Sequence, residues 1–100
     1  MAYKIIWTER ASDDLAAVVR YIARHNQEAA GEMGYGIYGR AQILVEFPEA
    51  GSIVRELSDP LWRQIVFRSY RIVHHLNHDT KIVEIIRVWH GARGDLEIPG

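Results

Sequence analysis

The sequence predicts an α+β domain in which a short N-terminal strand and an antiparallel helical hairpin precede a small, mainly antiparallel β-sheet. Two observations support this fold class. Apolar residues recur at helical spacing in the first half of the chain, and short β-branched and aromatic runs separated by turn residues fill the second half. Because 100 residues suffice for one small core, residues 1–100 are expected to form a single domain.

The first half contains one predicted strand and two predicted helices. Residues 3–7 should form the strand, and the Thr8 hydroxyl can cap the helix that follows to about residue 24. The apolar face of this helix consists of Ala11, Leu15, Val18 and Ile22. Asn26 can cap a second helix that continues to Pro48, and so short a connection makes the helices antiparallel. Four glycines, each costing about 1 kcal/mol relative to alanine, either weaken the second helix or allow close packing: Gly31, Gly34, Gly36 and Gly39.

The second half contains the predicted sheet. Its strands are expected at residues 52–57, 61–67, 70–76 and 81–89. Only Arg68 and Ser69 separate the second and third of these runs, a spacing typical of a tight hairpin. The fourth run is apolar on both faces and should lie near the middle of the sheet. The helices should cover one sheet face and leave the other open, and residues 94–100 should form a loosely held tail.

Composition disfavours several classes of protein. The chain has no cysteine, which excludes disulfides, thiol nucleophiles and zinc–cysteine sites and fits a reducing compartment. Charged residues at positions 9 and 10 come too early for a secretory signal, and no apolar run approaches the roughly 18 residues of a membrane span. We therefore expect a cytoplasmic protein without a membrane segment.

Two patterns resemble ligand sites but lack the required context. Residues 34–39 match the spacing of a dinucleotide-binding glycine loop, yet they lie inside a predicted helix that follows another helix. His74 and His75 point to opposite faces of a predicted strand, while His78 lies in a turn. The three imidazoles cannot converge without distortion, so we predict no metal site and no cofactor.

Charge is unevenly distributed along the chain. The net charge of −1 disfavours direct, sequence-specific DNA binding, because nucleic-acid-binding domains are usually basic. Residues 55–93 nevertheless hold seven basic against four acidic side chains. Their sheet arginines are Arg63, Arg68, Arg71 and Arg87. Two interpretations stay open: each pairs with a carboxylate such as Glu56 or Glu84, or the guanidinium groups converge on the open sheet face to bind phosphates or a partner's carboxylates.

Aromatic side chains and one histidine mark the end of the last strand. Trp7, Trp62 and Trp89 are interpreted as core or hairpin-packing residues, because large aromatics dominate burial in small domains. Trp89 has the alternative role of a partly exposed partner contact. His90 is the only plausible proton-transfer group at this position, since histidine titrates near neutral pH.

Two segments of the C-terminal half carry a specific resemblance. They are Ser69-Tyr70-Arg71-Ile72-Val73, preceded by Arg63 and Val66, and Ile85-Ile86-Arg87-Val88-Trp89-His90-Gly91-Ala92-Arg93. Weaker matches in the N-terminal half are Thr8-Glu9-Arg10-Ala11-Ser12-Asp13-Asp14-Leu15, Tyr21-Ile22 and Phe47-Pro48. Together they cover nearly the whole chain, which resembles the ParE branch of the RelE/ParE toxins of type II toxin–antitoxin systems.

The resemblance implies the same strand, helical hairpin and antiparallel sheet that the periodicity predicts. It also implies a cognate antitoxin, usually encoded alongside, that lays a segment over the toxin and neutralises it. ParE-like members poison DNA gyrase, RelE-like members cut messenger RNA in the ribosome, and such systems serve plasmid or stress maintenance.

The two activities make different demands on the residues. RNA cleavage by a ribose 2′-hydroxyl needs a base, an acid and cations around the phosphate, roles that His90, Arg71 and Arg87 could fill. RelE-like members, however, carry paired lysines on the strand matching residues 63–67 and a C-terminal tyrosine near the active site. Here an arginine and an apolar residue occupy the lysine positions, and no tyrosine follows the closing motif. We therefore prefer gyrase inhibition without catalytic residues, with ribosome-dependent mRNA cleavage as the alternative.

A third hypothesis is an inactive interaction module that only binds its antitoxin. Antitoxin binding should bury apolar surface along the helical hairpin together with some of the C-terminal arginines. The residues expected to bind the target or the antitoxin are Arg63, Arg68, Arg71, Arg87, Trp89, His90 and Arg93.

Overall fold

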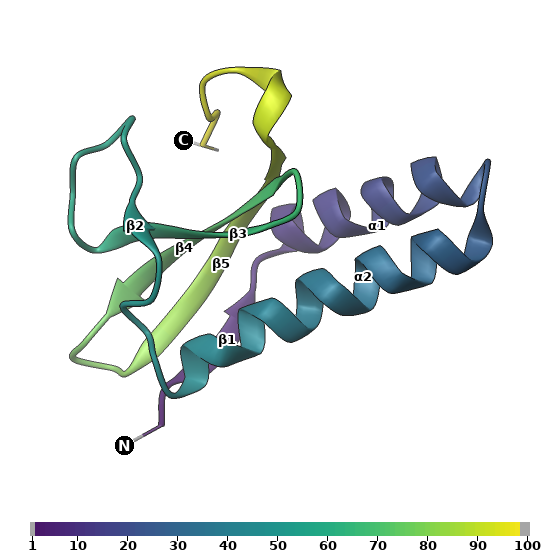
Figure 1. Ribbon diagram of the computed structural model, residues 1–100. Coiled ribbons are helices and arrows are strands. Elements are labelled where there is room, and N and C mark those ends of the chain that lie inside the picture. Colours follow the sequence, from purple (N-terminus) through teal and green to yellow (C-terminus); the bar gives the residue numbers. More distant parts are fainter. Residues whose placement is uncertain (1, 99–100) are drawn as a thin grey trace.

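The computed structural model describes residues 2–98 and shows two helices packed on one face of a five-stranded sheet (Figure 1). The elements are β1 (Lys4–Trp7), α1 (Glu9–Ala23), α2 (Gln27–Gln42), η1 (Ile43–Val45), β2 (Ser52–Ile53), β3 (Trp62–Phe67), β4 (Tyr70–Asn77), β5 (Ile82–His90) and η2 (Gly91–Arg93), where η denotes a 3-10 turn. The sheet order is β1-β5-β4-β3-β2, with β1 parallel to β5 and all other pairs antiparallel. This arrangement confirms the predicted α+β fold, and β5 lies between β1 and the central strand β4.

Both helices begin at the predicted caps. Thr8 Oγ1 accepts a hydrogen bond from Ala11 N at 3.1 Å, and Asn26 Oδ1 accepts one from Ala29 N at 2.9 Å. The antiparallel hairpin of α1 and α2 extends well beyond the sheet (Figure 1). Neither this pair nor any other helix within residues 2–98 has the length and apolarity of a membrane span.

The expected continuation of the second helix to Pro48 is wrong. The α-helix ends at Gln42 and tightens into η1, which finishes at Val45. Proline disfavours helical geometry in the residue before it, so the helix must end ahead of Phe47 and Pro48. The released Val45 carbonyl accepts a hydrogen bond from Tyr3 N at 2.8 Å, which ties the start of β1 to the end of the hairpin.

Close packing of α2 depends on two of its glycines. A Cβ atom at Gly36 would overlap the Phe67 ring on β3, and one at Gly34 would lie 3.1 Å from Val19 Cγ2 on α1. By contrast, Gly31 and Gly39 have no atom within 4 Å of an added Cβ. The glycines therefore bring the helix close to both the sheet and α1, as one of the two sequence interpretations expected.

The strand predicted at residues 52–57 is much shorter. The strand β2 contains only Ser52 and Ile53, and fully buried Val54 makes a last hydrogen bond to the Trp62 carbonyl of β3 at 2.9 Å before the chain turns. The Val54 carbonyl accepts from the N–H groups of Leu57 and Ser58, and Ser58 adopts a positive φ of 51°. Residues 54–58 thus form a turn, which brings Glu56 back over the sheet.

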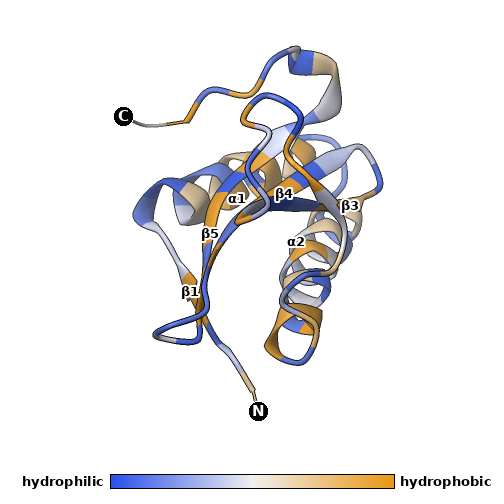
Figure 2. Cartoon of the chain, turned by 90° about the vertical axis from the view of Figure 1, so that its left-hand side faces the viewer, coloured by the Kyte–Doolittle hydropathy of each residue, from blue (hydrophilic) through white to orange (hydrophobic). Residues whose placement is uncertain are grey.

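The core lies between the helices and the sheet. Ile72, Leu76 and Ile85 on the central strands pack in one buried cluster with Ala11 and Ile37 of the helices. In Figure 2 the hydrophobic colouring runs along β5 and parts of both helices, whereas the turn between β4 and β5 is hydrophilic.

The three central histidines lie in different environments. His74 is on the helix-facing side and is completely buried, with its Nδ1 3.4 Å from the Ile72 carbonyl oxygen. His75 packs its ring 4.7 Å from that of Trp62, and His78 contacts Tyr3. Within residues 2–98 no three acidic, histidine or cysteine side chains are placed to hold a metal ion.

The sheet face opposite the helices is only partly open. The turn that carries Glu56 and the segment 94–98 both cross the end of β4 and β5. The expectation of a loosely held tail is therefore wrong for residues 94–98, which make three hydrogen bonds to this face, and residues 99–100 lie outside the described part of the chain.

Candidate functional site: an arginine cluster and a helical groove

Arg71, Arg87 and Trp89 share the sheet face that points away from the helices. In the β4–β5 ladder Arg71 pairs with Trp89, and Val73 pairs with Arg87. Because alternate residues of a strand point to the same face, these four side chains lie together, while Ile72 faces the helices. Arg71 and Arg87 are nevertheless 6% and 2% exposed, so neither is a free surface cation.

Arg71 is held by a carboxylate from the turn after β2. Its Nη1 and Nη2 donate to Glu56 Oε2 and Oε1 at 3.0 and 2.8 Å, and its Nε donates to Gln64 Oε1 at 2.6 Å. These hydrogen bonds from Arg71 lower the pKa of Glu56 from 4.5 to about 2. The pairing of this arginine with Glu56 was one of the two interpretations that the sequence left open.

Arg87 is held by Asp14 of α1. Its Nε and Nη2 donate to the two carboxylate oxygens at 2.8 and 3.1 Å. The pairing of β1 with β5 ends where Thr8 N donates to the Ile85 carbonyl. Beyond that point the Asp14 carboxylate accepts a hydrogen bond from Val88 N of β5 at 3.0 Å. Asp14 thus neutralises a buried cation and also satisfies the exposed edge of β5.

Two guanidinium groups pack on the Trp89 ring. Arg87 Cζ is 4.9 Å and Arg93 Cζ is 4.0 Å from its ring, and the indole Nε1 donates to the Gly94 carbonyl at 3.2 Å. The side chain is 1% exposed, which confirms the packing interpretation of this tryptophan. Trp7 and Trp62 are half-buried, and Trp7 stacks on Tyr38 of α2.

His90 ends β5 and caps the turn that follows. Its Nδ1 accepts a hydrogen bond from Ala92 N at 3.0 Å, so a neutral ring must carry its proton on Nε2. The ring also meets Tyr70 edge-on at 5.0 Å between centroids. Burial raises the pKa of Tyr70, with a smaller contribution from Tyr21 nearby.

Arg63 and Arg68 lie outside this cluster. Arg63 is on the helix-facing side of β3, because it pairs with His74, and it donates to the Gly51 carbonyl at 3.2 Å. Arg68 occupies the β3–β4 turn with a φ of 53° and stacks over the Phe67 ring at 5.1 Å. The structure therefore brings together Arg71, Arg87, Trp89 and Arg93 and does not converge the four sheet arginines on one face.

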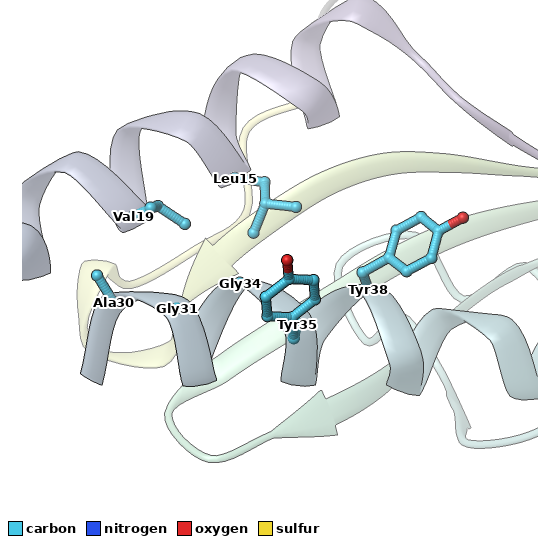
Figure 3. Close-up of a pocket in the computed structure, with 7 residues that line it drawn as sticks. All are labelled: Leu15, Val19, Ala30, Gly31, Gly34, Tyr35 and Tyr38. Carbon is cyan, nitrogen blue, oxygen red and sulfur yellow. The ribbon is translucent and has the colours of Figure 1, made fainter. Parts of the chain in front are cut away.

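A second candidate site is an apolar groove between the two helices (Figure 3). It has a volume of about 410 Å³ and is lined by Leu15, Val19, Ala30, Gly31, Gly34, Tyr35 and Tyr38. Leu15 and Val19 project from α1 toward α2, where the glycines leave the groove floor bare (Figure 3). Two tyrosines that line the groove are exposed, Tyr35 by 84% and Tyr38 by 49%, so an apolar patch is open to solvent there. The sequence signal for this groove was the glycine content of α2.

Two solved structures share the fold of this chain. A structure titled as the chromosomal ParDE toxin–antitoxin system of P. aeruginosa has a TM-score of 0.71 at 20% identity, with 89% of this chain and 96% of that chain covered. The RelBE2 toxin–antitoxin complex of Mycobacterium tuberculosis has a TM-score of 0.57 at 23% identity, with 90% and 99% covered.

Sequence comparison identifies the family. A sequence model described as "ParE toxin of type II toxin-antitoxin system, parDE" matches residues 5–94. Toxin RelE2 of Caulobacter vibrioides is 31% identical over 90 residues, which cover 90% of this chain and 97% of that protein. The chain belongs to the ParE toxin family and is a type II toxin of the RelE/ParE superfamily.

Proposed function

We propose that this toxin inhibits DNA gyrase and is neutralised by a cognate antitoxin. The observation that carries the choice of gyrase is that Arg71 and Arg87 are each closed in a bidentate ion pair with a carboxylate of the same chain. A site for RNA cleavage needs cations free to stabilise the phosphorane, and these two are already neutralised. The match to a family described as ParE toxins supports the same choice.

The geometry of His90 also favours a role other than proton abstraction. A general base needs a free nitrogen lone pair within reach of the substrate hydroxyl. The Nδ1 lone pair accepts the Ala92 N–H, and Nε2 of the neutral ring carries the proton. The side chain can donate a hydrogen bond to a partner, but it must break its cap before it can act as a base.

Contacts with the target then fall on the exposed members of the predicted set. Arg68 and Arg93 present guanidinium groups at the surface, and half-buried His90 packs against Tyr70. In this proposal Arg63, Arg71, Arg87 and Trp89 position the surface rather than bind gyrase. Rim cations of this kind chiefly set association rate and salt dependence.

The helical groove is the proposed docking site for the antitoxin. Both solved relatives are titled as toxin–antitoxin systems or complexes, which supports a partner of this kind. An apolar groove flanked by exposed aromatics accepts the apolar face of an amphipathic helix. The exposed rings of Tyr35 and Tyr38 would then be covered, as expected for aromatic anchors of an interface.

A gyrase assay tests the target. The purified toxin should inhibit supercoiling of relaxed plasmid by gyrase, and addition of the antitoxin should restore supercoiling. Full gyrase activity at saturating toxin would remove the proposal.

Ribosome-dependent mRNA cleavage is the second candidate, favoured by the 31% identity to Toxin RelE2. Ribosome-bound transcripts incubated with the same preparation should remain intact under the leading proposal. Cleaved transcripts with unaffected gyrase would establish the endonuclease instead. A folded chain that is harmless in both assays and in cells lacking the antitoxin would be an inactive binding module.

A further inference from the structure

The segment 94–98, called the strap below, is held almost entirely through its main chain. Trp89 Nε1 donates to the Gly94 carbonyl at 3.2 Å, and Arg87 Nη1 donates to the Glu97 carbonyl at 2.8 Å. Between them, Leu96 N donates to Glu56 Oε2 at 2.7 Å. An indole, a carboxylate and a guanidinium thus bind three peptide groups of the strap, as a receptor for a short linear peptide does.

Residues outside the strap also contact each of the three receptor groups. Glu56 is oriented by two hydrogen bonds from Arg71, and Arg87 is oriented by two hydrogen bonds to Asp14. The guanidinium groups of Arg87 and Arg93 both pack on the Trp89 ring, at 4.9 and 4.0 Å. Such preorganisation means that little side-chain entropy is lost when a peptide binds.

The strap itself is weakly anchored by its side chains. Gly94, Asp95 and Glu97 are exposed, and Leu96 is half-buried. Ile98 is half-buried and lines a pocket together with Trp62 and Ile86 of the sheet. Its charged side chains make one long ion pair, 3.9 Å between Glu97 and Arg93. Both groups are exposed, so this pair adds little stability.

The strap begins at a natural hinge. Gly94 has a φ of +86° and no neighbouring atom within 4 Å of an added Cβ, so the chain can pivot there without a clash. Figure 2 shows the strap arching away from η2 with hydrophilic and hydrophobic residues in alternation.

We propose that Trp89, Glu56 and Arg87 form a receptor for a short linear segment of a partner protein, and that the strap occupies this receptor in cis. The matching segment alternates carboxylate and apolar residues, as the strap does from Asp95 to Ile98. The second carboxylate suits the exposed Arg93, as Glu97 does in the strap, and the last apolar residue lies beside Trp62, as Ile98 does. This inference holds whether the toxin acts on gyrase or on the ribosome.

The tethered strap competes with any partner segment. A short tether gives the strap an effective concentration on the order of millimolar at the receptor. A free peptide binds only when the strap is displaced. Weakening the strap should therefore strengthen binding of a peptide in trans, by about tenfold or more if the cis form dominates.

The test uses the full-length chain and a labelled peptide with the sequence of residues 94–98 and blocked ends. Leu96→Pro removes the N–H that Glu56 accepts from the strap, whereas Asp79→Ala alters an exposed side chain between β4 and β5, outside the strap, and serves as the control. Fluorescence anisotropy should show at least about tenfold tighter peptide binding to Leu96→Pro than to the parent chain, with Asp79→Ala unchanged.

A second peptide separates main-chain recognition from nonspecific apolar binding. N-methylation of its leucine removes the same N–H while retaining the side chain, and binding to Leu96→Pro should then fall about tenfold. Circular dichroism confirms that the variant is folded. Equal affinity for the parent and Leu96→Pro chains, no binding to a folded Leu96→Pro chain, or equal binding of the methylated peptide would each overturn the inference.

Discussion

Asp14 and Arg87 form a buried ion pair that joins the first turns of α1 to the end of β5, with Arg87 Nε 2.8 Å from Asp14 Oδ2. Arg87 is 2% exposed, so loss of the carboxylate would leave a guanidinium group without its counter-charge in a site that excludes water. The same oxygen accepts from Val88 N, so the pair also completes the sheet edge. Substitution of Asp14 should therefore lower the stability of the whole chain.

Asp14→Asn should destabilise the chain by about 3 kcal/mol, because breaking a buried pair at one partner leaves an uncompensated charge. Urea unfolding followed by circular dichroism measures the change. Asp13→Asn is the matched control, since it removes the same charge from an exposed neighbour on α1 and should alter stability by less than about 0.5 kcal/mol. Equal effects of the two substitutions would contradict the structural role of the pair.

The burial of His74 predicts that the chain loses stability in mild acid. Burial lowers its pKa from 6.5 to about 4, so the unfolded chain binds a proton between these values that the folded chain does not. The free energy of unfolding is therefore at its full value above pH 6.5. It decreases as the pH falls toward 4, by up to about 3 kcal/mol. Glu56, with its pKa lowered to about 2, acts in a separate window below pH 4.5.

The pH dependence can be assigned by substitution. His74→Leu removes the titrating group and should flatten the stability profile between pH 6.5 and 4, whatever its effect on absolute stability. His25→Gln alters an exposed histidine at the end of α1 and should leave the slope unchanged. A slope that survives in His74→Leu would mean that another group is responsible.

Two glycines of α2 should respond to alanine in opposite directions. Gly36→Ala places a methyl group against the Phe67 ring and should destabilise the fold by about 1–3 kcal/mol despite its better helix propensity. Gly39→Ala meets open space and should stabilise the chain by about 0.5–1 kcal/mol. Thermal unfolding of both variants checks the signs, and stabilisation by Gly36→Ala would show that α2 sits farther from the sheet.

Local features were predictable from sequence, whereas the pairing of distant groups was not. Thr8 and Asn26 cap the helices as expected, because capping depends on residues within one turn of the chain. The Asp14–Arg87 pair joins positions 73 residues apart, and no periodicity specifies it. The strap was missed because three contacts to its main chain leave no pattern in its own side chains.

Substitution of the exposed arginines Arg68 and Arg93 should weaken gyrase inhibition more than it lowers the stability of the fold. Arg68→Gln combined with Arg93→Gln is expected to raise the toxin concentration needed for half-maximal gyrase inhibition by about tenfold, through slower association. Arg24→Gln, an exposed change at the end of α1, should leave inhibition unchanged. If the double variant inhibits as well as the parent chain, the target surface lies elsewhere.

The groove between the helices offers the sharpest test of antitoxin docking, because two glycines on one helix differ only in where they lie. Gly31 and Gly39 both have open space around an added Cβ, but only Gly31 lines the groove. Gly31→Leu should fill the groove, preserve the fold and weaken antitoxin binding more than about thirtyfold, since blocking a central apolar contact costs about 2 kcal/mol or more. Gly39→Leu makes the same exchange outside the groove and should bind the antitoxin as the parent chain does, in calorimetric titrations of both variants. Equal antitoxin affinity for the two variants would place the docking surface away from the hairpin.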